Sequence, residues 1–511
     1  MGFAATKAVA LSGVEGHVVD VEAHGHPGLP AFVVSGLPDA ACAQAPDRIR
    51  AGTSTAGLAL SMRRWTVNLS PAGLPKVGSG FDIAIAVALL GADGQLPGRL
   101  TRPVAHIGEL GLDGSIRAVP GVLPMVLAAA RSGVERIVVP TASAREACLV
   151  PGLRVHAVGD LTDLTRLYRT LSQGHEPQDR TPDRPPRGAT RMPDLSDVAG
   201  QAEARAALEV AAAGQHHILL HGPPGAGKTM LAERLPGLLP GLRSTEALEV
   251  TGIHSVLGLL PEDGSLIEAP PFVAPHHGAS MASVIGGGSG RVRPGAVSRA
   301  HRGVLFLDES PEFRRDVLDG LRQPLESGEV VIARAERHVR LPARFQMVMA
   351  ANPCPCGAGF AKGRGCQCTP LARRSYFGKI SGPLLDRIDL RVVLLPLTRA
   401  DLGDSAGESS ADVAARVAGA RERQRRRLRA TPWAVNADVP GAHLREGALR
   451  LSAEVTRDLD RAMDTGTLTL RGYDRCLRVA WTLADLAGRD RPLRADASFA
   501  LTLRAPSGMA A

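Results

Sequence analysis

Residues 217–229 read His217-Ile218-Leu219-Leu220-His221-Gly222-Pro223-Pro224-Gly225-Ala226-Gly227-Lys228-Thr229. An apolar strand here runs into a glycine-rich turn, and a helical run follows from Met230. Glycines allow successive backbone N–H groups to converge on one point, Lys228 adds a cation for the terminal phosphates, and Thr229 offers a hydroxyl to Mg²⁺. The segment from Gly222 to Thr229 is therefore predicted to be a loop that binds a nucleoside triphosphate.

A second element further along the chain supports this prediction. Val304-Leu305-Phe306-Leu307-Asp308-Glu309 places two acidic residues directly after four apolar ones, as at the end of a buried strand. Hydrolysis of a triphosphate needs a metal ion and an aligned water. Asp308 is predicted to hold Mg²⁺ through water, and Glu309 to orient or deprotonate the attacking water. The alternative is a solvated acidic pair at a strand end.

A third buried run, Phe345 to Ala351, ends at Asn352. An amide in this position can contact both the γ-phosphate and the attacking water, so Asn352 is predicted to belong to the same site. Because Asn before Pro also commonly begins a turn, a purely conformational role is the alternative.

The overall composition limits the classes of protein. A chain of 511 residues is too long for one hydrophobic core, so two or three domains are expected. The 60 basic and 51 acidic residues leave a net charge of +9, which suits a polyanionic partner. No apolar run approaches the roughly 18 residues that cross a bilayer, so we expect a soluble, cytoplasmic protein.

Prolines and charged residues divide the chain. Residues 173–193 contain five prolines and almost no large apolar side chain, so they are predicted to form an exposed linker. Residues 1–172 alternate short β-like segments with alanine-rich helical ones, which indicates an α/β or α+β domain. In residues 194–397, strand-like and helix-like segments alternate, which indicates a parallel sheet covered by helices on both faces. Residues 398–511 are predicted to form a helical lid.

Four of the seven cysteines lie within residues 354–368. Two Cys-x-Cys pairs, separated by a segment rich in Gly and Lys/Arg, can bring four thiolates around one tetrahedral ion, and zinc is the metal that this donor set favours. The predicted ligands of this closed, structural site are Cys354, Cys356, Cys366 and Cys368. The alternatives are reduced cysteines in a loop and a redox switch.

The order of these elements resembles that of the AAA+ ATPases, and within them the magnesium-chelatase-like family known as ComM or YifB. The resemblance covers nearly the whole chain. It rests on segments that are more specific than a phosphate loop: Asn68-Leu69-Ser70-Pro71, Gly78-Ser79-Gly80-Phe81-Asp82, Asp197-Val198-Ala199-Gly200-Gln201, Ala274-Pro275-His276-His277, Ala351-Asn352-Pro353-Cys354-Pro355-Cys356-Gly357 and Ser381-Gly382-Pro383-Leu384-Leu385-Asp386-Arg387-Ile388-Asp389. The resemblance implies a hexameric motor that uses ATP and Mg²⁺ to drive branch migration of DNA in natural transformation and recombination.

The resemblance also implies roles for two polar residues of the central domain. Asn352 matches the sensor-1 position. Arg387 matches an arginine finger that reaches the nucleotide of a neighbouring subunit, which would make assembly part of the active site. The alternative for Arg387 is an ion pair with Asp386 or Asp389.

In the lid, Arg471 best fits the sensor-2 arginine, which would report the state of the nucleotide. Arg475 and Arg478 follow on the next turns of the same helix, and either is an alternative for this contact. The first domain resembles the ribosomal-S5-type fold that the protease domain of Lon shares. Ser79 falls near the position of the Lon nucleophile, but the segment 119–125 supplies no lysine base, so peptide hydrolysis is not expected.

Basic loops are the candidates for contact with DNA. One set follows the glycines 286–288, and a second lies on a predicted hairpin from Val330 to Leu341. With 3% aromatic residues the chain has little material for base stacking, so binding is expected to be directed to the phosphate backbone and independent of sequence. The candidate side chains are Arg291, Arg293, Arg299, Arg334, Arg337, His338 and Arg340. A charged, exposed hairpin without a ligand is the alternative.

The arginines of one predicted helix and a pair of adjacent histidines are expected to have structural roles. The arginines of the predicted helix 411–428 are expected to form a solvated face or a subunit contact rather than a phosphate site. His276 and His277 resemble a metal pair, but adjacent residues are expected to point to different sides, which favours a structural or interface role. The competing functions for the whole chain are a magnesium-chelatase motor subunit, an ATP-dependent protease and a regulator that only senses ATP.

Overall fold

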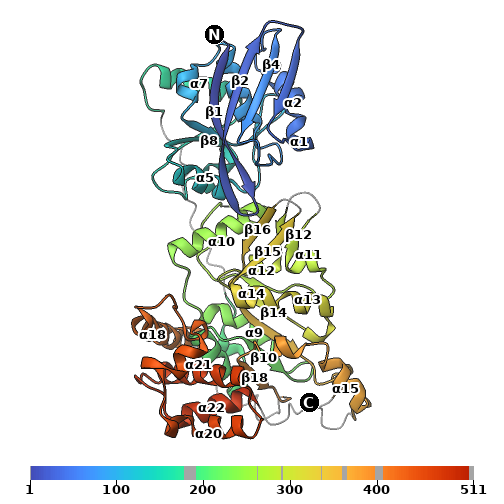
Figure 1. Ribbon diagram of the computed structural model, residues 1–511, viewed down its shortest axis with the longest axis vertical. Helices are drawn as coiled ribbons and strands as arrows, with labels where there is room; N and C mark the ends of the chain where they lie inside the picture. Colours follow the sequence, from blue (N-terminus) through green and yellow to red (C-terminus); the bar gives the residue numbers. More distant parts are fainter. Residues whose placement is uncertain are drawn as a thin grey trace.

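The computed structural model describes residues 2–177, 192–261, 263–288, 292–334, 337–358, 365–396 and 407–505. Figure 1 shows three parts along the long axis: an N-terminal sheet with its helices, a second sheet, and a group of C-terminal helices. Parts of the predicted linker, cysteine loop and lid lie outside the described residues, as does Arg291. So do the side chains of Arg334 and Arg337.

The N-terminal part is built on a seven-stranded sheet in the order β3-β4-β2-β1-β5-β8-β9. β1 and β2 form a long antiparallel pair that runs from Phe3↔His24 to Ser12↔Glu15. The last three strands of the sheet are parallel to one another. The strands are β1 (Phe3–Ser12), β2 (Glu15–His26), β3 (Ala31–Ser35), β4 (Arg64–Ser70), β5 (Val104–His106), β8 (Arg136–Pro140) and β9 (Arg154–Val158). The sequence did not predict β1.

Two helices cover opposite faces of this sheet. Every residue of α3 (Asp82–Ala92) is buried, because this apolar helix lies against β1 and β2 in one core. α5 (Val122–Arg131) packs on the other face in a second core. A mixed sheet between helices of this kind agrees with the predicted α/β character.

The central part contains the five-stranded sheet β11-β14-β17-β10-β18, in which every described pair is parallel. This confirms the predicted parallel sheet. Alternate residues of its strands enter two cores, so that Ile218 and Leu220 face one side while Leu219 faces the other. The strands are β10 (Ile218–His221), β11 (Phe272–Val273), β14 (Val304–Leu307), β17 (Gln346–Ala351) and β18 (Leu390–Val393).

Two small hairpins project from the central part towards the N-terminal sheet (Figure 1). β15 (Glu329–Arg334) and β16 (Arg337–Pro342) form the predicted antiparallel hairpin. The second joins β12 (Gly286–Gly287) to β13 (Arg293–Pro294). The turn between β1 and β2 meets β16, because a Cβ atom on Gly13 would lie 2.6 Å from Cγ1 of Val339. The N-terminal sheet therefore touches the larger hairpin directly.

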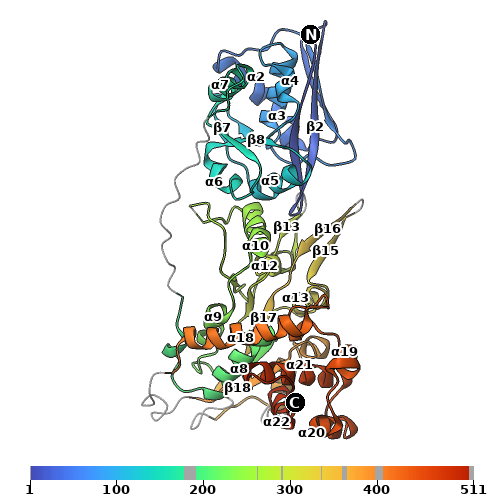
Figure 2. The ribbon, with the colours of Figure 1, turned by 90° about the vertical axis from the view of Figure 1, so that its left-hand side faces the viewer.

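A second contact joins the N-terminal and central parts (Figure 2). α10 (Ser244–Leu257) lies against α5, where the backbone N–H of Gly121 donates to the carbonyl of Ser255 at 3.1 Å. The carboxylate of Glu146 accepts from the hydroxyl of Ser255 and, at 2.7 Å, from the N–H of Leu123. Burial raises the pKa of Glu146, and these hydrogen bonds oppose that rise.

The C-terminal helices continue one of the two central cores. α18 packs between α8 (Ala202–Gly214) and α21, and Figure 2 shows it crossing this part of the molecule. The helices are α18 (Ser410–Leu428), α19 (Gly441–Arg445), α20 (Ala453–Asp464), α21 (Leu470–Leu486) and α22 (Arg494–Arg504). Within the described ranges, no helix is long and apolar enough to cross a membrane.

The arginine-rich helix α18 has the expected solvated face only in part. Arg423, Arg425 and Arg426 are exposed, whereas two other arginines pack against neighbouring helices. Arg421 donates to the carbonyl of Ala212 at 2.6 Å and thereby caps the last turn of α8. Arg427 pairs with the buried Asp485 at 2.6 Å, and its guanidinium lies 4.5 Å from the ring centre of Trp481. These side chains pack inside the molecule because α18 lies between two other helices.

Candidate nucleotide-binding site

The predicted phosphate loop connects β10 to α9 (Lys228–Leu238) at the carboxyl edge of the parallel sheet. Gly222 must be glycine, because a Cβ atom there would lie 2.6 Å from the carbonyl oxygen of Leu394. Gly227 has a φ of 90°, a conformation that side chains disfavour. The sequence thus provides the close approach and the sharp turn that a phosphate cradle needs.

Lys228 is buried beneath this loop. Its Nζ donates to the carbonyls of Gly222 and Pro223 at 2.7 and 2.9 Å, and to Oδ1 of Asn352 at 3.0 Å. Burial lowers the pKa of Lys228, while the carboxylates of Asp308 and Glu309 oppose that shift. The ammonium group of Lys228 therefore lies at the loop, where phosphate oxygens can replace the backbone carbonyls as its hydrogen-bond acceptors.

The proposed ligands of Mg²⁺ already contact each other. The hydroxyl of Thr229 donates to Oδ2 of Asp308 at 3.0 Å. Carboxylate and hydroxyl oxygens are suitable donors for Mg²⁺, which usually keeps several waters and binds to substrate phosphates. This donor set therefore fits the metal that the sequence predicted.

Glu309 begins a strained turn directly after β14. Its φ of 49° places it in the left-handed region, which is uncommon for residues other than glycine and occurs preferentially at functional sites. Its carboxylate is about half exposed, and Oε2 lies 3.3 Å from Nδ1 of His277. The structure thus brings Lys228, Thr229, Asp308, Glu309 and Asn352 together at one edge of the sheet.

The contact with His277 was missed by sequence reasoning, and the expectation that His276 and His277 point to different sides was wrong. The rings of His276 and His277 lie side by side, with centroids 4.1 Å apart, rather than on different sides. The reason is that residues 274–280 form a loop and not an extended strand. Finding this contact required knowledge that β11 lies beside β14.

The four predicted zinc ligands converge next to this site. Their ligand atoms all lie within 4.8 Å of one another, with Sγ separations of 3.3 Å for Cys354 to Cys356 and 3.5 Å for each of these to Cys366. None of these four cysteines forms a disulfide, and a tetrahedral zinc site has sulfur atoms about 3.8 Å apart. A hydrogen bond from the backbone N–H of Cys368 lowers the pKa of Cys366 to about 6. The donor set therefore fits zinc.

The cysteine loop also contacts the phosphate loop. Gly357 has a φ of 74°, and a Cβ atom on it would lie 2.7 Å from Cγ of Pro224. Because Cys354 follows Asn352 by two residues, the same short segment carries the predicted sensor and packs on the phosphate cradle. Order in the cysteine loop and order in the nucleotide site are thus physically linked.

Arg387 lies elsewhere, just before β18. Its side chain is mostly buried, donates to the carbonyl of Pro383 at 2.6 Å and pairs with Glu326. The alternative pairing with Asp386 or Asp389 is not formed. Asp386 instead lies 3.6 Å from Arg504, and Asp389 pairs with Arg475 at 2.6 Å.

Arg471 lies beside Arg387 rather than at the phosphate loop. Both line a cavity of about 170 Å³ together with Asp474, Arg475 and Arg478, and no residue of the phosphate loop belongs to its lining. Arg471 is exposed and makes no hydrogen bond or ion pair within the part of the chain that the structure describes. Arg478 donates from Nε to the carbonyl of Val439 at 2.8 Å.

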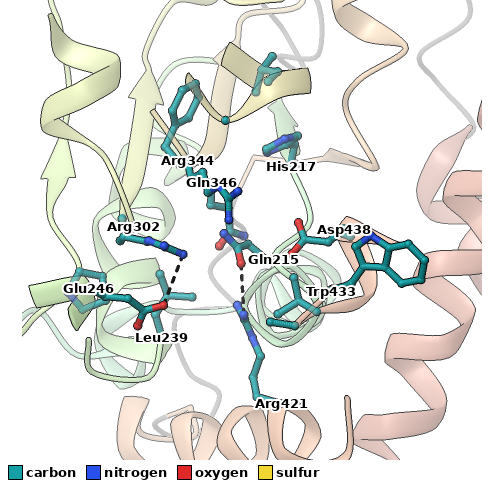
Figure 3. Close-up of a pocket in the computed structure, with 18 of the residues that line it drawn as sticks. Gln215, His217, Leu239, Glu246, Arg302, Arg344, Gln346, Arg421, Trp433 and Asp438 are labelled. Carbon is teal, nitrogen blue, oxygen red and sulfur yellow. Dashed lines mark hydrogen bonds and ion pairs between the residues drawn. The ribbon is translucent and has the colours of Figure 1, made fainter. Parts of the chain in front are cut away.

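A larger cavity of about 890 Å³ adjoins the first one, at the amino edge of the sheet (Figure 3). Seven arginines and four acidic residues line it, so its surface is positive overall. Arg421 and Asp438 reach into it from the C-terminal part, and Arg302 and Arg344 from the central part (Figure 3). This large cavity therefore lies at the amino edge of the sheet, opposite the phosphate loop.

The described candidates for DNA contact are exposed. Arg293 lies on β13, Arg299 at the end of α12 (Ala296–Arg299), and His338 and Arg340 on β16. Arg340 pairs with Glu329 across the hairpin. In the N-terminal part, the hydroxyl of Ser79 donates to the carboxylate of Glu109. No lysine lies in the segment where the Lon resemblance would require one.

Family models match three successive segments of the chain. The model described as magnesium chelatase, subunit ChlI, matches residues 194–402. The model for subunit ChlI of Mg-chelatase matches residues 21–143, and the ChlI C-terminal model matches residues 407–504. Together these matches cover much of the N-terminal sheet, without β1 and β9, together with the parallel sheet and the C-terminal helices.

Curated relatives match almost from end to end. The chain is 38% identical to the competence protein ComM of Haemophilus influenzae, over 99% of this chain and 98% of that protein. The chain belongs to the ComM/YifB family of magnesium-chelatase-like proteins. Another member, YifB of Escherichia coli, is 38% identical over 97% of the chain, and an uncharacterized protein of Mycobacterium tuberculosis is 50% identical over 97%.

The magnesium-chelatase 38 kDa subunit of Rhodobacter capsulatus is a more distant relative of this ComM/YifB chain. It is 30% identical over only 31% of the chain and 50% of that subunit. The full-length matches therefore support an AAA+ protein of the ComM type, with mixed α/β domains and a parallel sheet.

Proposed function

We propose that this ComM/YifB-family chain is a cytoplasmic, ATP-driven DNA motor that works as a ring, with six copies as the expected number. In this proposal the N-terminal part is the S5/Lon-like domain, the central part is the AAA+ motor, and the C-terminal helices are its lid. The substrate would be branched or single-stranded DNA of recombination or natural transformation, without sequence preference.

One observation carries the proposal: the predicted catalytic residues divide between opposite edges of the sheet. Ile218 pairs with Leu390 at the start of two parallel strands, so Arg387 precedes the strands whereas the phosphate loop follows them. Four strand residues at roughly 3.3 Å each separate these edges by about 13 Å. In this proposal Arg387 and Arg471 would serve the nucleotide of a neighbouring copy. Such a head-to-tail contact forms a ring when its rotation closes, as the proposal requires.

The proposed hydrolysis follows from the groups at the carboxyl edge. The phosphate loop and Lys228 would hold the triphosphate, and Thr229 and Asp308 would position Mg²⁺. Glu309 would orient or deprotonate the water, while Asn352, which already contacts Lys228, would contact both the water and the γ-phosphate. Bound Mg²⁺ would neutralise charge that develops on the phosphate oxygens.

The cysteine loop supports a structural metal in the same proposal. Cys354, Cys356, Cys366 and Cys368 would hold one zinc ion with no open coordination position. Since Gly357 packs on Pro224, the ion would stiffen the loop that carries Asn352 and the cradle beside it.

Exposed basic side chains on the two hairpins support the choice of DNA. Arg293 and Arg340 are exposed on two hairpins that project from the same end of the central part, and the phosphate backbone would be their ligand. The test is ATP hydrolysis by purified protein at low salt, with and without a four-way DNA junction. We expect basal turnover that the junction raises and that high salt reduces again. Turnover that no forked or four-way DNA changes, without unwinding, would contradict the DNA motor.

A further inference from the structure

The amino edge of the five-stranded sheet places two arginines next to each other. β14 and β17 are parallel, with Val304 opposite Gln346, so the residues that precede these strands also lie side by side. The N–H of Arg302 donates to the carbonyl of Arg344 at 2.6 Å, and the N–H of Arg344 donates to Nδ1 of His301 at 3.0 Å. Both arginine side chains line the larger cavity. The central part therefore holds two cations at this cavity on a well-anchored backbone.

The C-terminal helices supply further arginines to the same cavity. Arg421 of α18 donates to the carbonyl of Ala212 at 2.6 Å and to Oε1 of Gln215 at 3.4 Å. Arg478 of α21 donates from Nε to a backbone carbonyl at 2.8 Å. Burial lowers the pKa of Arg421 to about 10 and also lowers the pKa of Arg478. All of these acceptors are neutral, so they do not balance the two charges.

Three guanidinium groups of the cavity therefore have no anionic partner. Arg302 pairs with two glutamates, but Arg344, Arg421 and Arg478 form no ion pair with any described residue. Asp438 lines the same cavity and also forms no ion pair within the described ranges. Burial raises the pKa of Asp438, and the charges of the same three arginines oppose that rise. The three cations thus act on one carboxylate and leave a surplus of positive charge.

The size and charge of the cavity indicate the kind of ligand that it fits. A buried charge without a partner is costly, and an anion that bonds to it offsets this cost. The fork of an arginine matches the oxygens of a phosphate group. The volume of about 890 Å³ is within the range of small-molecule sites and is large for a single phosphate. Figure 3 shows Arg344 and Arg421 on opposite sides of the cavity, so one ligand with several phosphate groups can contact both.

We propose that this cavity binds a small polyanion with several phosphate groups, of the size of a nucleoside polyphosphate, through Arg344, Arg421 and Arg478. The site lies at the opposite edge of the sheet from the phosphate loop. It is also separate from Arg387 and Arg471, which do not belong to its lining. Because its cations come from both the central part and the C-terminal helices, the ligand would hold these two parts of the chain together.

The test measures binding of inorganic tripolyphosphate to full-length Lys228→Ala protein by calorimetry at low salt. This background weakens the phosphate loop, and the measurement involves neither ATP hydrolysis nor ring formation. We expect saturable binding of about one tripolyphosphate per chain and a Tm that rises with its concentration. Adding Arg344→Gln, which keeps most of the stem that packs on Gly328, should weaken binding about ten-fold. An unchanged Tm without ligand shows that this variant is folded.

Two further variants of the same background locate the anion. Asp438→Asn removes a like charge and should strengthen tripolyphosphate binding about three- to ten-fold. Arg471→Gln removes an exposed arginine of the smaller cavity and is the matched control, which should bind as its parent does. The inference is overturned if no saturable binding occurs, if Arg344→Gln binds as tightly as its parent, or if Arg471→Gln weakens binding equally. Failure of the wild type to hydrolyse ATP would instead refute the proposed function and leave these results unaffected.

Discussion

At the carboxyl edge of the five-stranded sheet, Lys228 bonds to Asn352 and Thr229 bonds to Asp308. At the amino edge, by contrast, Arg387 and Arg471 line a cavity whose lining includes none of these four residues. The first edge is a nearly complete site for binding a triphosphate. The second presents the guanidinium of Arg387, which pairs with Glu326, and the exposed side chain of Arg471. In the proposed ring, one copy of the chain would supply half of each of two sites.

The largest effect is expected at the amino edge. Arg387→Ala should lower kcat about 10³- to 10⁵-fold, the range seen for arginine fingers, while ATP binding by the intact phosphate loop persists. Steady-state hydrolysis and equilibrium binding of ATP measure the two quantities separately. Arg322→Ala, which removes an exposed arginine from α14 (Arg322–Ser327), is the matched control and should hydrolyse normally. If kcat falls equally in both variants, Arg387 has no specific role in hydrolysis.

The counterpart at the carboxyl edge is Glu309. Replacement by Gln removes the base but keeps the shape, so turnover should fall about 10²- to 10⁴-fold with ATP still bound. Glu312→Gln changes an exposed carboxylate three residues away and should leave turnover intact. If Glu309→Gln hydrolyses ATP at the normal rate, the water is activated by another group and the assignment is wrong.

The amino edge also depends on a buried charge. Burial alone would raise the pKa of Asp389, yet the charge of Arg475, with His216 and His217, holds it well below its usual range. Asp389→Asn leaves Arg475 without its partner and should lower the free energy of unfolding by about 3–5 kcal/mol. Urea denaturation measures the loss. A change below about 1 kcal/mol, typical of exposed pairs, would contradict this role.

Acid should weaken the same region. Burial lowers the pKa of both His216 and His217 from 6.5 to about 4, so between these values the unfolded chain binds protons that the folded chain excludes. Stability from the neutral imidazoles is present above pH 6.5 and is lost as the pH falls towards 4. The depressed pKa of Asp389 acts in the same direction at lower pH. Thermal melts across this range should show a falling Tm, and a flat profile would refute the linkage.

A smaller effect is expected from the cysteine loop. Removal of zinc by a chelator, or Cys366→Ser, should weaken ATP binding about three- to ten-fold, because Gly357 then packs less firmly on Pro224. Metal content and ATP affinity are to be measured on the same samples. Cys148→Ser, which changes a cysteine of the N-terminal part, is the control. If the affinity for ATP is unchanged after complete loss of the metal, the cysteine loop does not influence the nucleotide site.

Local motifs explain what the sequence could predict at the carboxyl edge. Each of these motifs can be recognised from a short continuous stretch of sequence. One strand precedes a glycine-rich turn, another precedes two acidic residues, and a third precedes Asn352. In a parallel sheet these strand ends meet at one edge, so the structure brings the predicted groups together.

Contacts between distant segments explain what the sequence could not predict. His277 reaches Glu309 only because β11 lies beside β14, an order that no local pattern encodes. Arg471 lies beside Arg387 because of the way the C-terminal helices dock. The packing of Arg421 and Arg427 has the same cause, since helix periodicity alone cannot reveal which helices enclose α18.

Mixing two inactive variants tests the division of the site most directly. Lys228→Ala lacks triphosphate binding but keeps Arg387, whereas Arg387→Ala keeps the phosphate loop. If each site is shared between neighbouring copies, an equal mixture should regain about a quarter of the wild-type ATP turnover, because about a quarter of the random interfaces join two intact halves. A co-assembled mixture that remains as inactive as its components would contradict the shared site.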